Sequence, residues 1–326
     1  MIPDDELIWI DPTMATADPL KLPELGIHGI WADVLRLYKI HPVVSGNKWF
    51  KLKEHLRVAR TNNCRHLVTF GGAWSNHLVA VAYAARESDI PVTGIVRGER
   101  PRHLSLTLQA ASSYGMRLQF ISRAEYAQKT REDPHGGLLS PGDHGLVGGY
   151  AAGGLAAEYP GSYIIPEGGA GPAGIKGSKE ILSLVENSRY SHILCAIGTG
   201  TTYLGLAEAS LPGQWVIGIP VLKGLDSFLT AVGSRLTDPG KLDHCRINTG
   251  YHFGGYARKS QKLLDFMNNF YRLTGIPTDF VYTAKLFYAA LDMIGQGFFP
   301  SGSQILLLHS GGLQGNGSLA PGVLDF

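Results

Sequence analysis

Short apolar segments alternate with helical patterns along this chain, and the alternation constrains the fold more than any other feature. The segments HLVTF (66–70), PVTGIVRG (91–98) and MRLQFIS (116–122) each have the length and composition of a buried strand. Between them, LVAVAYAAR (78–86) and LSLTLQAASSYG (104–115) have the pattern of helices. Such alternation is typical of parallel sheets covered by helices. We therefore predict an α/β fold with two open, mostly parallel sheets and helices on both faces.

The same rhythm returns after a Gly- and Pro-rich, loop-like stretch at 130–161. The strands and helices expected there are SYIIP (162–166), a helix from Ile175, HILCAI (192–197), a helix near Tyr203, QWVIGIPV (214–221), amphipathic helices at 257–275 and 283–297, and QILLLH (304–309). A chain of 326 residues is too long for one ordinary core. We expect a small domain at 52–150, inserted into a large cofactor-binding domain built from 1–51 and 151–326.

Composition excludes several classes of protein. Hydrophobic residues make up 44% of the chain and charged residues 17%, and the formal net charge is only +2. This balance indicates a compact enzyme-like protein with no electrostatic drive toward nucleic acid or membranes. Three widely spaced cysteines predict no disulfide framework. The acidic N-terminal segment has no apolar core of a signal peptide, and no apolar run reaches the length of a membrane span, so we expect a cytoplasmic location.

A lysine on a Gly-Asn turn is the first candidate for chemistry. In SGNKWFKLKE (45–54), Lys48 directly follows the turn and Lys51 lies three residues further on. FGGAWSNH (70–77) then places a strand end and a helix start, whose N-terminus can bind an anion. One presented amine near an anion site suits a Schiff-base cofactor such as pyridoxal phosphate. On the alternative interpretation, Lys48 is a surface lysine, and Ser75 or Asn76 is only the helix N-cap.

Two Gly-rich corners are candidates for binding phosphate. GTGTT (198–202) follows a buried strand and precedes a helix, so backbone N–H groups and Thr hydroxyls can converge on an anion. An ordinary tight turn is the alternative. GAGPAG (169–174) fits the dinucleotide fingerprint, but the next strand ends in Cys195-Ala196-Ile197 without an acidic residue for a ribose hydroxyl. A dinucleotide-dependent oxidoreductase is therefore a third-ranked hypothesis.

Five motifs in a fixed order carry a family resemblance. They are GNKxxKL (46–52), GGxxSNH (71–77), GTGTT (198–202), YTAK (282–285) and HSGG (309–312). With them the chain resembles the 1-aminocyclopropane-1-carboxylate deaminase and D-cysteine desulfhydrase family, whose members are pyridoxal-phosphate enzymes with a tryptophan-synthase-β-like fold (fold type II). The resemblance implies pyridoxal 5'-phosphate as cofactor, a small amino-acid substrate, a cleft between the two domains as its site, and a homodimer.

The resemblance also implies a role for each matching residue. Lys48 would attach the cofactor and then act as acid and base at the substrate α-carbon, and Lys51 would help to hold the phosphate. Asn76 would bond the ring hydroxyl, and Ser75 would meet the substrate carboxylate or carry a second proton. The remaining implied residues are Gly198, Thr199, Gly200, Thr201 and Thr202 around the phosphate, Ser310 at the pyridine nitrogen, Thr283 in the YTAK motif beside the cofactor, and Tyr256 and Tyr282 facing the substrate.

Two positions favour one branch of the family. Cyclopropane-opening members carry Glu and Leu where this chain has Thr283 and Ser310, whereas D-cysteine members carry hydroxyl residues. The resemblance therefore implies α,β-elimination from a D-amino acid, giving an oxo acid, ammonia and a thiol. Phe50 and Trp74 replace polar residues of the family pattern, so the substrate stays open. Alternatives are 1-aminocyclopropane-1-carboxylate deaminase and a pyridoxal-phosphate-binding protein with little catalysis.

Overall fold

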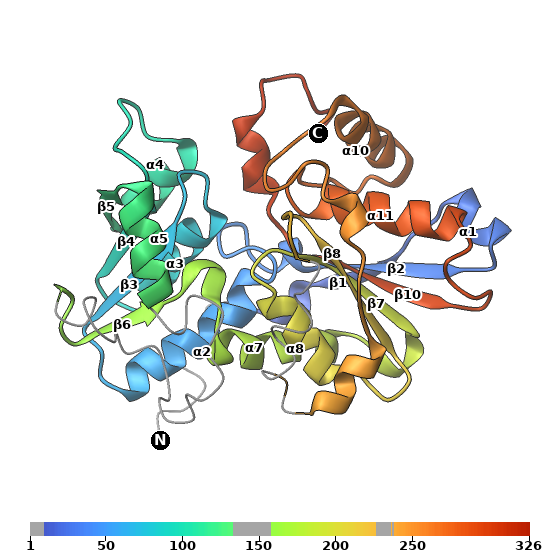
Figure 1. Ribbon diagram of the computed structural model, residues 1–326, viewed down its shortest axis with the longest axis horizontal. Helices are drawn as coiled ribbons and strands as arrows, with labels where there is room; N and C mark the ends of the chain where they lie inside the picture. Colours follow the sequence, from blue (N-terminus) through green and yellow to red (C-terminus); the bar gives the residue numbers. More distant parts are fainter. Residues whose placement is uncertain (1–9, 133–157, 226–235, 237) are drawn as a thin grey trace. The chain divides into compact units, whose positions relative to one another are not determined.

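The chain forms two compact units, each built around its own sheet. The computed structural model describes residues 10–132, 158–225, 236 and 238–326 (Figure 1). The first unit consists mainly of Lys48–Ser178 with His41–Val44. The second unit is made of Pro12–Ile40, Ser45–Asn47 and Lys179–Phe326. The domain boundaries expected from the sequence, with a small domain at 52–150, remain a prediction.

The first unit contains a four-stranded sheet in the order β5-β4-β3-β6, with every neighbouring pair parallel. Its strands are β3 (His66–Gly71), β4 (Val92–Arg97), β5 (Arg117–Ile121) and β6 (Ser162–Ile165). Its helices are α2 (Lys48–Thr61), α3 (Asn76–Glu87), α4 (Leu106–Ser113), α5 (Arg123–Glu132) and α7 (Pro172–Lys179). Each of β4 and β5 is reached through a helical crossover, as parallel pairing requires.

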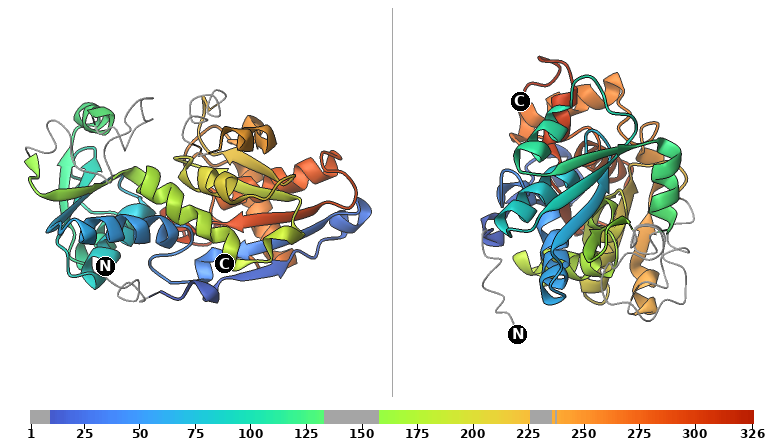
Figure 2. Two further views of the ribbon diagram at one scale, coloured as in Figure 1. Left: turned by 90° about the horizontal axis from the view of Figure 1, so that it is seen from below. Right: turned by 90° about the vertical axis from the view of Figure 1, so that its left-hand side faces the viewer.

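Alternation along the strands explains how this unit packs. Val68 and Phe70 point to one face, where they form a cluster with Tyr126 of α5. Helices α3 and α4 pack against each other on the opposite face of the sheet (Figure 2). Both faces of the central strands β3 and β4 are therefore buried, which is why these strands are mostly apolar.

The second unit contains a six-stranded sheet in the order β1-β2-β10-β7-β8-β9. Its strands are β1 (Thr16–Pro19), β2 (Trp31–Arg36), β7 (His192–Ile197), β8 (Trp215–Pro220), β9 (Cys245–Ile247) and β10 (Gln304–His309). Only β1 is antiparallel to its neighbour. Its helices are α1 (Pro23–Ile27), α8 (Thr201–Ala209), α10 (Gln261–Thr274) and α11 (Thr283–Gly295).

Helix α11 supplies much of the core of this unit. Its residues Leu286, Phe287, Ala290 and Met293 recur at helical spacing and pack into one cluster with apolar residues of the sheet. Helix α10 lies beside α11 and ends at Gly275, whose φ of 67° gives the left-handed C-cap. Because the buried side chains of α11 repeat at a period of about 3.6 residues, the helix could be recognised in the sequence.

The predicted α/β fold with two open, mostly parallel sheets is confirmed. The helix expected from Ile175 begins earlier, at Pro172, because a proline is well accommodated in the first turn of a helix. The sequence analysis did not identify β1, β2 or α2. The loop-like stretch at 130–161 lies largely outside the described residues.

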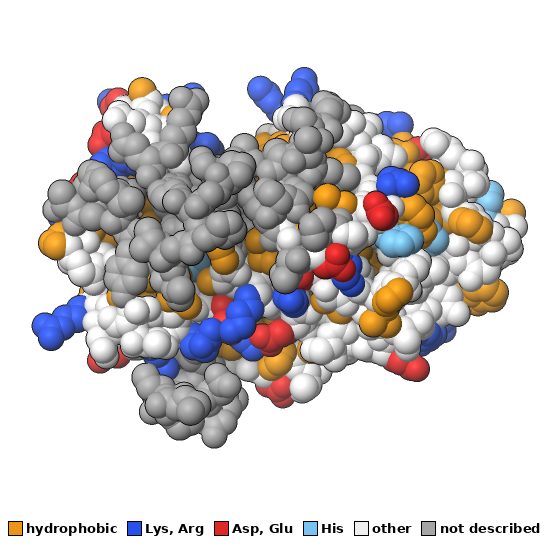
Figure 3. Space-filling model, turned by 60° about the horizontal axis from the view of Figure 1, so that its bottom comes forward, with side chains coloured by type: hydrophobic (Ala, Val, Ile, Leu, Met, Phe, Trp, Pro, Cys, Tyr) orange, Lys and Arg blue, Asp and Glu red, His pale blue; other side chains and the backbone are white. Residues whose placement is uncertain are grey.

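The edge strands of the second unit's sheet are short, and the surface charges are mixed. Edge strand β1 has four residues and ends in Pro19, and edge strand β9 has three. On the face of the molecule shown in Figure 3, Lys and Arg side chains lie beside Asp and Glu rather than in one basic field. In the described ranges, none of the helices combines the length and apolar character needed to cross a membrane.

Candidate active site

The Gly46–Asn47 turn, which directly precedes Lys48, is fastened to two of the predicted corners. Gly46 has a φ of 69°, and a Cβ atom on it would lie 1.9 Å from the carbonyl oxygen of Ser310. The Asn47 backbone N–H donates to that same oxygen at 3.2 Å. The buried Asn47 side chain donates from Nδ2 to the Thr202 hydroxyl at 2.8 Å. Only glycine fits at position 46. These contacts fix the backbone immediately before Lys48.

Two of these corners come from neighbouring strands. Strands β7 and β10 are parallel neighbours in the second unit, with Leu307 opposite Leu194. The carboxyl ends of parallel strands meet at one edge of a sheet, so the GTGTT and HSGG corners lie at the same edge. This edge is where ligands bind in open α/β sheets.

The GTGTT corner leaves the start of α8 open. Gly200 is the N-cap with a φ of 82°, and no side chain caps the helix there. Thr201 and Thr202 are buried, and the Thr199 and Thr201 hydroxyls lie 3.0 Å apart. The first N–H groups of α8 have no partner within the helix, and the helix dipole favours negative charge at this end. The corner has the properties of a phosphate site.

Ser310 and Thr283 differ in how their hydroxyls are used. The Thr283 hydroxyl donates to Asp279 Oδ1 at 2.8 Å and accepts from the Asp279 backbone N–H at 2.8 Å. Ser310 is also buried, but its hydroxyl makes no hydrogen bond with the described residues. Of the two predicted hydroxyl groups, Ser310 is therefore the one available to a ligand atom, and Thr283 is committed to the start of α11.

Asp279 is a site residue that the sequence analysis missed. Its carboxylate is fully buried and accepts from the backbone N–H groups of Val281, Tyr282 and Thr283 at 2.9 Å each. Burial raises the pKa of the Asp279 carboxyl, although these donors oppose the shift. A Cβ atom on Gly312 would lie 3.1 Å from the same carboxylate. Asp279 thus fixes the start of α11 beside the HSGG corner.

In the first unit, Lys48 begins α2 and Lys51 follows one turn later on the same helix. Lys51 is buried, and its Nζ donates to the Gly168 carbonyl at 3.1 Å. A Cβ atom on Gly169 would lie 3.1 Å from Lys51 Cβ. Gly169, the first residue of the GAGPAG corner, therefore leaves room for the Lys51 side chain, and the preceding Gly168 accepts from its ammonium.

His77 lies against these lysines as a neutral imidazole. The Thr69 hydroxyl donates its proton to the Ile165 carbonyl at 2.8 Å, so it must accept from His77 Nε2 at 2.9 Å. The bare Nδ1 of His77 is buried and makes no hydrogen bond with the described residues. Burial, and then the charges of Lys48 and Lys51, hold the pKa of His77 well below its usual value. The sequence suggested only a capping or packing role for this residue.

The SNH corner is capped by its own serine. Ser75 is the N-cap of α3, and its Oγ accepts from the Leu78 N–H at 3.3 Å. Asn76 is half-buried at the first position of the helix. Trp74 is 43% exposed, so its ring is partly in contact with solvent. By contrast, Phe50 is buried within α2.

The two predicted tyrosines meet in the second unit. Their ring centroids are 6.1 Å apart in an edge-to-face arrangement, and the Tyr282 hydroxyl lies 3.5 Å from that of Tyr256. A Cβ atom on Gly198 would lie 3.1 Å from Tyr282 Cε1, which places this ring at the GTGTT corner. Tyr256 is 45% exposed. The structure thus brings both tyrosines to the proposed phosphate corner.

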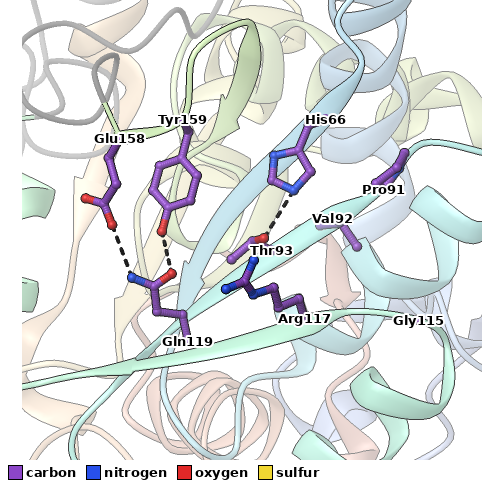
Figure 4. A pocket seen from close by; sticks show the side chains of 9 residues that line it. All are labelled: His66, Pro91, Val92, Thr93, Gly115, Arg117, Gln119, Glu158 and Tyr159. Carbon is purple, nitrogen blue, oxygen red and sulfur yellow. Dashed lines mark hydrogen bonds between the residues drawn. The ribbon is translucent and has the colours of Figure 1, made fainter.

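A separate polar pocket of about 450 Å³ lies in the first unit (Figure 4). Its lining includes His66, Val92 and Arg117, which begin β3, β4 and β5. It therefore opens at the amino ends of these strands, whereas the SNH corner follows the carboxyl end of β3. None of the predicted site residues lines it. Within the described ranges, no group of three or more His, Cys, Asp or Glu is placed to hold a metal ion.

Relatives of known name align with most of the chain. A Pyrococcus abyssi protein whose name proposes 1-aminocyclopropane-1-carboxylate deaminase activity is 27% identical over 287 residues, covering 83% of this chain and 81% of the relative. The bifunctional D-cysteine desulfhydrase/1-aminocyclopropane-1-carboxylate deaminase of Arabidopsis thaliana is 27% identical over 294 residues, covering 83% and 70%. Over most of its length the chain is thus similar to proteins named as deaminases of this kind and to one bifunctional D-cysteine desulfhydrase. The resemblance seen in the five motifs is thereby confirmed.

Solved structures agree on the fold. The crystal structure of a 1-aminocyclopropane-1-carboxylate deaminase homologue superposes on this chain with a TM-score of 0.71 at 21% identity, covering 97% of both chains. A hydrogen sulfide-producing enzyme from Fusobacterium nucleatum superposes with a TM-score of 0.60 at 13% identity, covering 93% of this chain and 97% of the other. No family model matches the sequence.

Proposed function

We propose that this protein is a pyridoxal-phosphate-dependent lyase that eliminates a thiol or a similar group from a D-amino acid, giving an oxo acid and ammonia. The coarser class, a pyridoxal-phosphate-dependent deaminase or lyase of fold type II, is the one to which its named relatives point. We propose the specific reaction, elimination from a D-amino acid, and the role of each residue in it.

One observation supports the proposal above the others. The turn that precedes Lys48 is hydrogen-bonded to Thr202 of the GTGTT corner and to the backbone of Ser310. A reactive amine, an anion-binding helix start and a buried hydroxyl are the three groups that a phosphorylated pyridine aldehyde requires. The buried and otherwise unused Ser310 hydroxyl fits a ring nitrogen, and the uncapped α8 fits a phosphate.

The bound cofactor would supply an electron sink for charge that develops at the substrate α-carbon. The chain's own residues do the rest. The Lys48 amine, in its neutral form, would take the α-proton, and the β-group would leave as a thiolate that takes up a proton. Water would then hydrolyse the released imine to the oxo acid and ammonia. Gly198, Thr199, Gly200, Thr201 and Thr202 hold the phosphate, while Asn76 orients the ring. Ser75, Tyr256 and Tyr282 hold the substrate or move protons at its polar atoms.

Thr283 and Ser310 support elimination rather than ring opening. Neither position carries an acid that would keep a ring nitrogen protonated, and the hydroxyl of Ser310 is a weaker partner. Removal of an α-proton needs less stabilisation than opening a ring that has no α-proton to lose. The Asp279 carboxylate lies at the same end of α11, but it is occupied by backbone donors and by Thr283.

The central test is Lys48→Ala, with Lys53→Ala on the same helix as its control. The purified protein should show a visible absorbance band and a borohydride-reducible cofactor link. Lys48→Ala should lose both, and Lys53→Ala should keep both. A reducible link that survives in Lys48→Ala would refute the assignment of this lysine.

A substrate screen decides the reaction. Oxo-acid and sulfide release should be measured with D- and L-amino acids and with 1-aminocyclopropane-1-carboxylate. Oxo acid and sulfide from D-cysteine or another D-amino acid would support the proposal. Turnover of the cyclopropane alone would make the chain a deaminase of that substrate, and no turnover by the cofactor-loaded protein would favour a binding protein. A protein without the visible band would favour the dinucleotide hypothesis.

The proposal extends to assembly and location. The family resemblance supports a homodimer, which light scattering of the purified protein would test. We also propose a cytoplasmic enzyme that binds a small molecule and neither nucleic acid nor membrane. Localisation of the tagged full chain in its host would test the compartment.

A further inference from the structure

Lys285 is a fully buried lysine in the second unit that the proposed reaction does not use. It lies in the first turn of α11, and its Nζ donates to the carbonyl oxygens of His252 at 3.0 Å and Gly255 at 2.8 Å. Burial lowers the pKa of Lys285 to about 8, and the Asp279 charge opposes this shift. A buried ammonium is expensive unless it is hydrogen-bonded, so these two carbonyls are the reason that it can be there.

The loop that Lys285 grips is held in a strained conformation. Phe253 and Ala257 have φ angles of 51° and 52°, in the left-handed region that side chains rarely adopt. Such residues persist only where their surroundings fix them. The two acceptors lie on either side of Phe253, and the second directly precedes Tyr256. The lysine therefore acts as a clamp on the first part of the loop at 252–257.

The clamp joins the two tyrosines. Tyr256 lies inside the gripped loop, and Tyr282 lies one helical turn before Lys285. The Tyr282 backbone N–H is itself fixed by Asp279 Oδ2 at 2.9 Å. One end of one helix thus fixes Tyr282 directly and holds the Tyr256 loop through Lys285, so that the rings meet edge to face at 6.1 Å.

We propose that Lys285 is a positioning residue that holds Tyr256 against Tyr282 beside the GTGTT corner and thereby sets the affinity for substrate. Lys285 does not contact substrate or cofactor in this proposal, which rests on the function proposed above. Loss of the clamp should loosen the exposed Tyr256 and raise KM. It should have little effect on kcat, because this inference assigns Tyr256 to holding the substrate and assigns proton transfer at the α-carbon to Lys48.

The test compares Lys285→Met, which keeps the length of the side chain and removes its donors, with Lys285→Gln, which keeps N–H donors without the charge. Lys262→Met, an exposed lysine on neighbouring α10, is the matched control. Amide hydrogen exchange over 252–258 should speed up at least about tenfold in Lys285→Met, less in Lys285→Gln, and remain unchanged in the control. KM for the substrate found in the screen should rise at least about tenfold with kcat within about threefold.

The outcomes separate this inference from the proposed function. If no amino acid is turned over, the proposed function fails, and hydrogen exchange still decides whether Lys285 clamps the loop. If exchange over 252–258 is unchanged in Lys285→Met, the clamp is wrong. If exchange rises while KM stays the same, the role in substrate affinity is wrong. Should Lys285→Met not fold, Lys285→Gln and Tyr256→Ala give the same two readouts, and a normal KM in Tyr256→Ala would overturn the role.

Discussion

Two strand-to-helix corners, one in each unit, illustrate how similar local sequences serve different ends. In the first unit, β3 runs into α3 through GGAWSNH, and Ser75 caps the helix by accepting from Leu78. In the second unit, β7 runs into α8 through GTGTT, where Gly200 leaves the helix start without a side-chain cap. At the first corner a side chain already accepts from the start of the helix. At the second corner no side chain does, so the first N–H groups of the helix are available to an external anion.

The largest predicted difference between the two units is in their stability at acidic pH. Each contains a fully buried neutral histidine whose pKa burial lowers to about 4, His55 in the first and His309 in the second. A histidine with a depressed pKa contributes stability that is present above pH 6.5 and is lost as the pH falls toward 4, because the unfolded chain takes up the proton first. Acidification from above pH 6.5 to below pH 4 should lower the free energy of unfolding by roughly 3 kcal/mol for each histidine.

His77 at the SNH corner adds a further loss of the same sign in the first unit, since its pKa is also lowered. In the second unit the raised pKa of Asp279 works in the opposite direction and favours the folded state in acid. Hydrogen exchange between pH 7 and 4 should therefore show the first unit opening at the higher pH. His77→Gln should reduce the difference between the pH values at which the two units open. Opening of both units at the same pH would contradict this account.

The second-largest effect is expected from a negative charge at the GTGTT corner, which should weaken cofactor binding. Thr199→Asp places a carboxylate on an exposed residue at the start of α8, where the helix dipole tolerates it. Repulsion of a phosphate at about 5 Å and an effective dielectric of about 20 is about 3 kcal/mol, which corresponds to roughly 100-fold weaker binding. Titration of the apoprotein with pyridoxal phosphate measures this. The neutral Thr199→Asn should bind normally; equal binding by both variants would mean that the phosphate lies elsewhere.

A smaller loss is expected where the Lys48 turn is fastened to the open corner. Asn47→Ala leaves the buried Thr202 hydroxyl without its donor, which should lower the free energy of unfolding by about 2 kcal/mol. Urea unfolding measures the change. The double variant with Thr202→Val should be less destabilised than the sum of the two single changes, whereas strict additivity would show that the bond contributes nothing.

The smallest effect is expected at the corner that caps itself. Ser75→Ala should lower the free energy of unfolding by about 1 kcal/mol, and Ser75→Thr should restore most of it, because threonine can cap the same N–H group. Thermal unfolding of the apoprotein measures both. An unchanged Tm in Ser75→Ala would mean that Ser75 is kept at this position for substrate alone.

Much of the fold could be predicted because its strands are buried on both faces. Segments such as HLVTF and QILLLH are mostly apolar and buried, and α11 carries a stripe of buried apolar residues. Helix α2 escaped detection although it buries apolar residues at helical spacing, because Lys51, Glu54 and His55 are buried among them and obscure the pattern. Polar burial of this kind depends on partners far away in the sequence.

The candidate site could likewise be predicted only where the signal lies in the local sequence. Motif spacing was enough to nominate Lys48 and the GTGTT corner, because glycines and a lysine at fixed offsets have few other uses. Asp279 was missed because its four hydrogen bonds form only once the start of α11 exists. The roles of Lys285 and of the His77 tautomer likewise depend on carbonyls that are remote in sequence.

The short borders of the second unit's sheet limit how two copies of the chain could associate. Adding a strand from a second copy requires a row of free N–H and C=O groups along an edge. Strand β1 ends in a proline, which has no N–H, and β9 offers only three residues. Strand addition from a second copy, and fibre growth by strand stacking, would therefore gain little from either of these two borders.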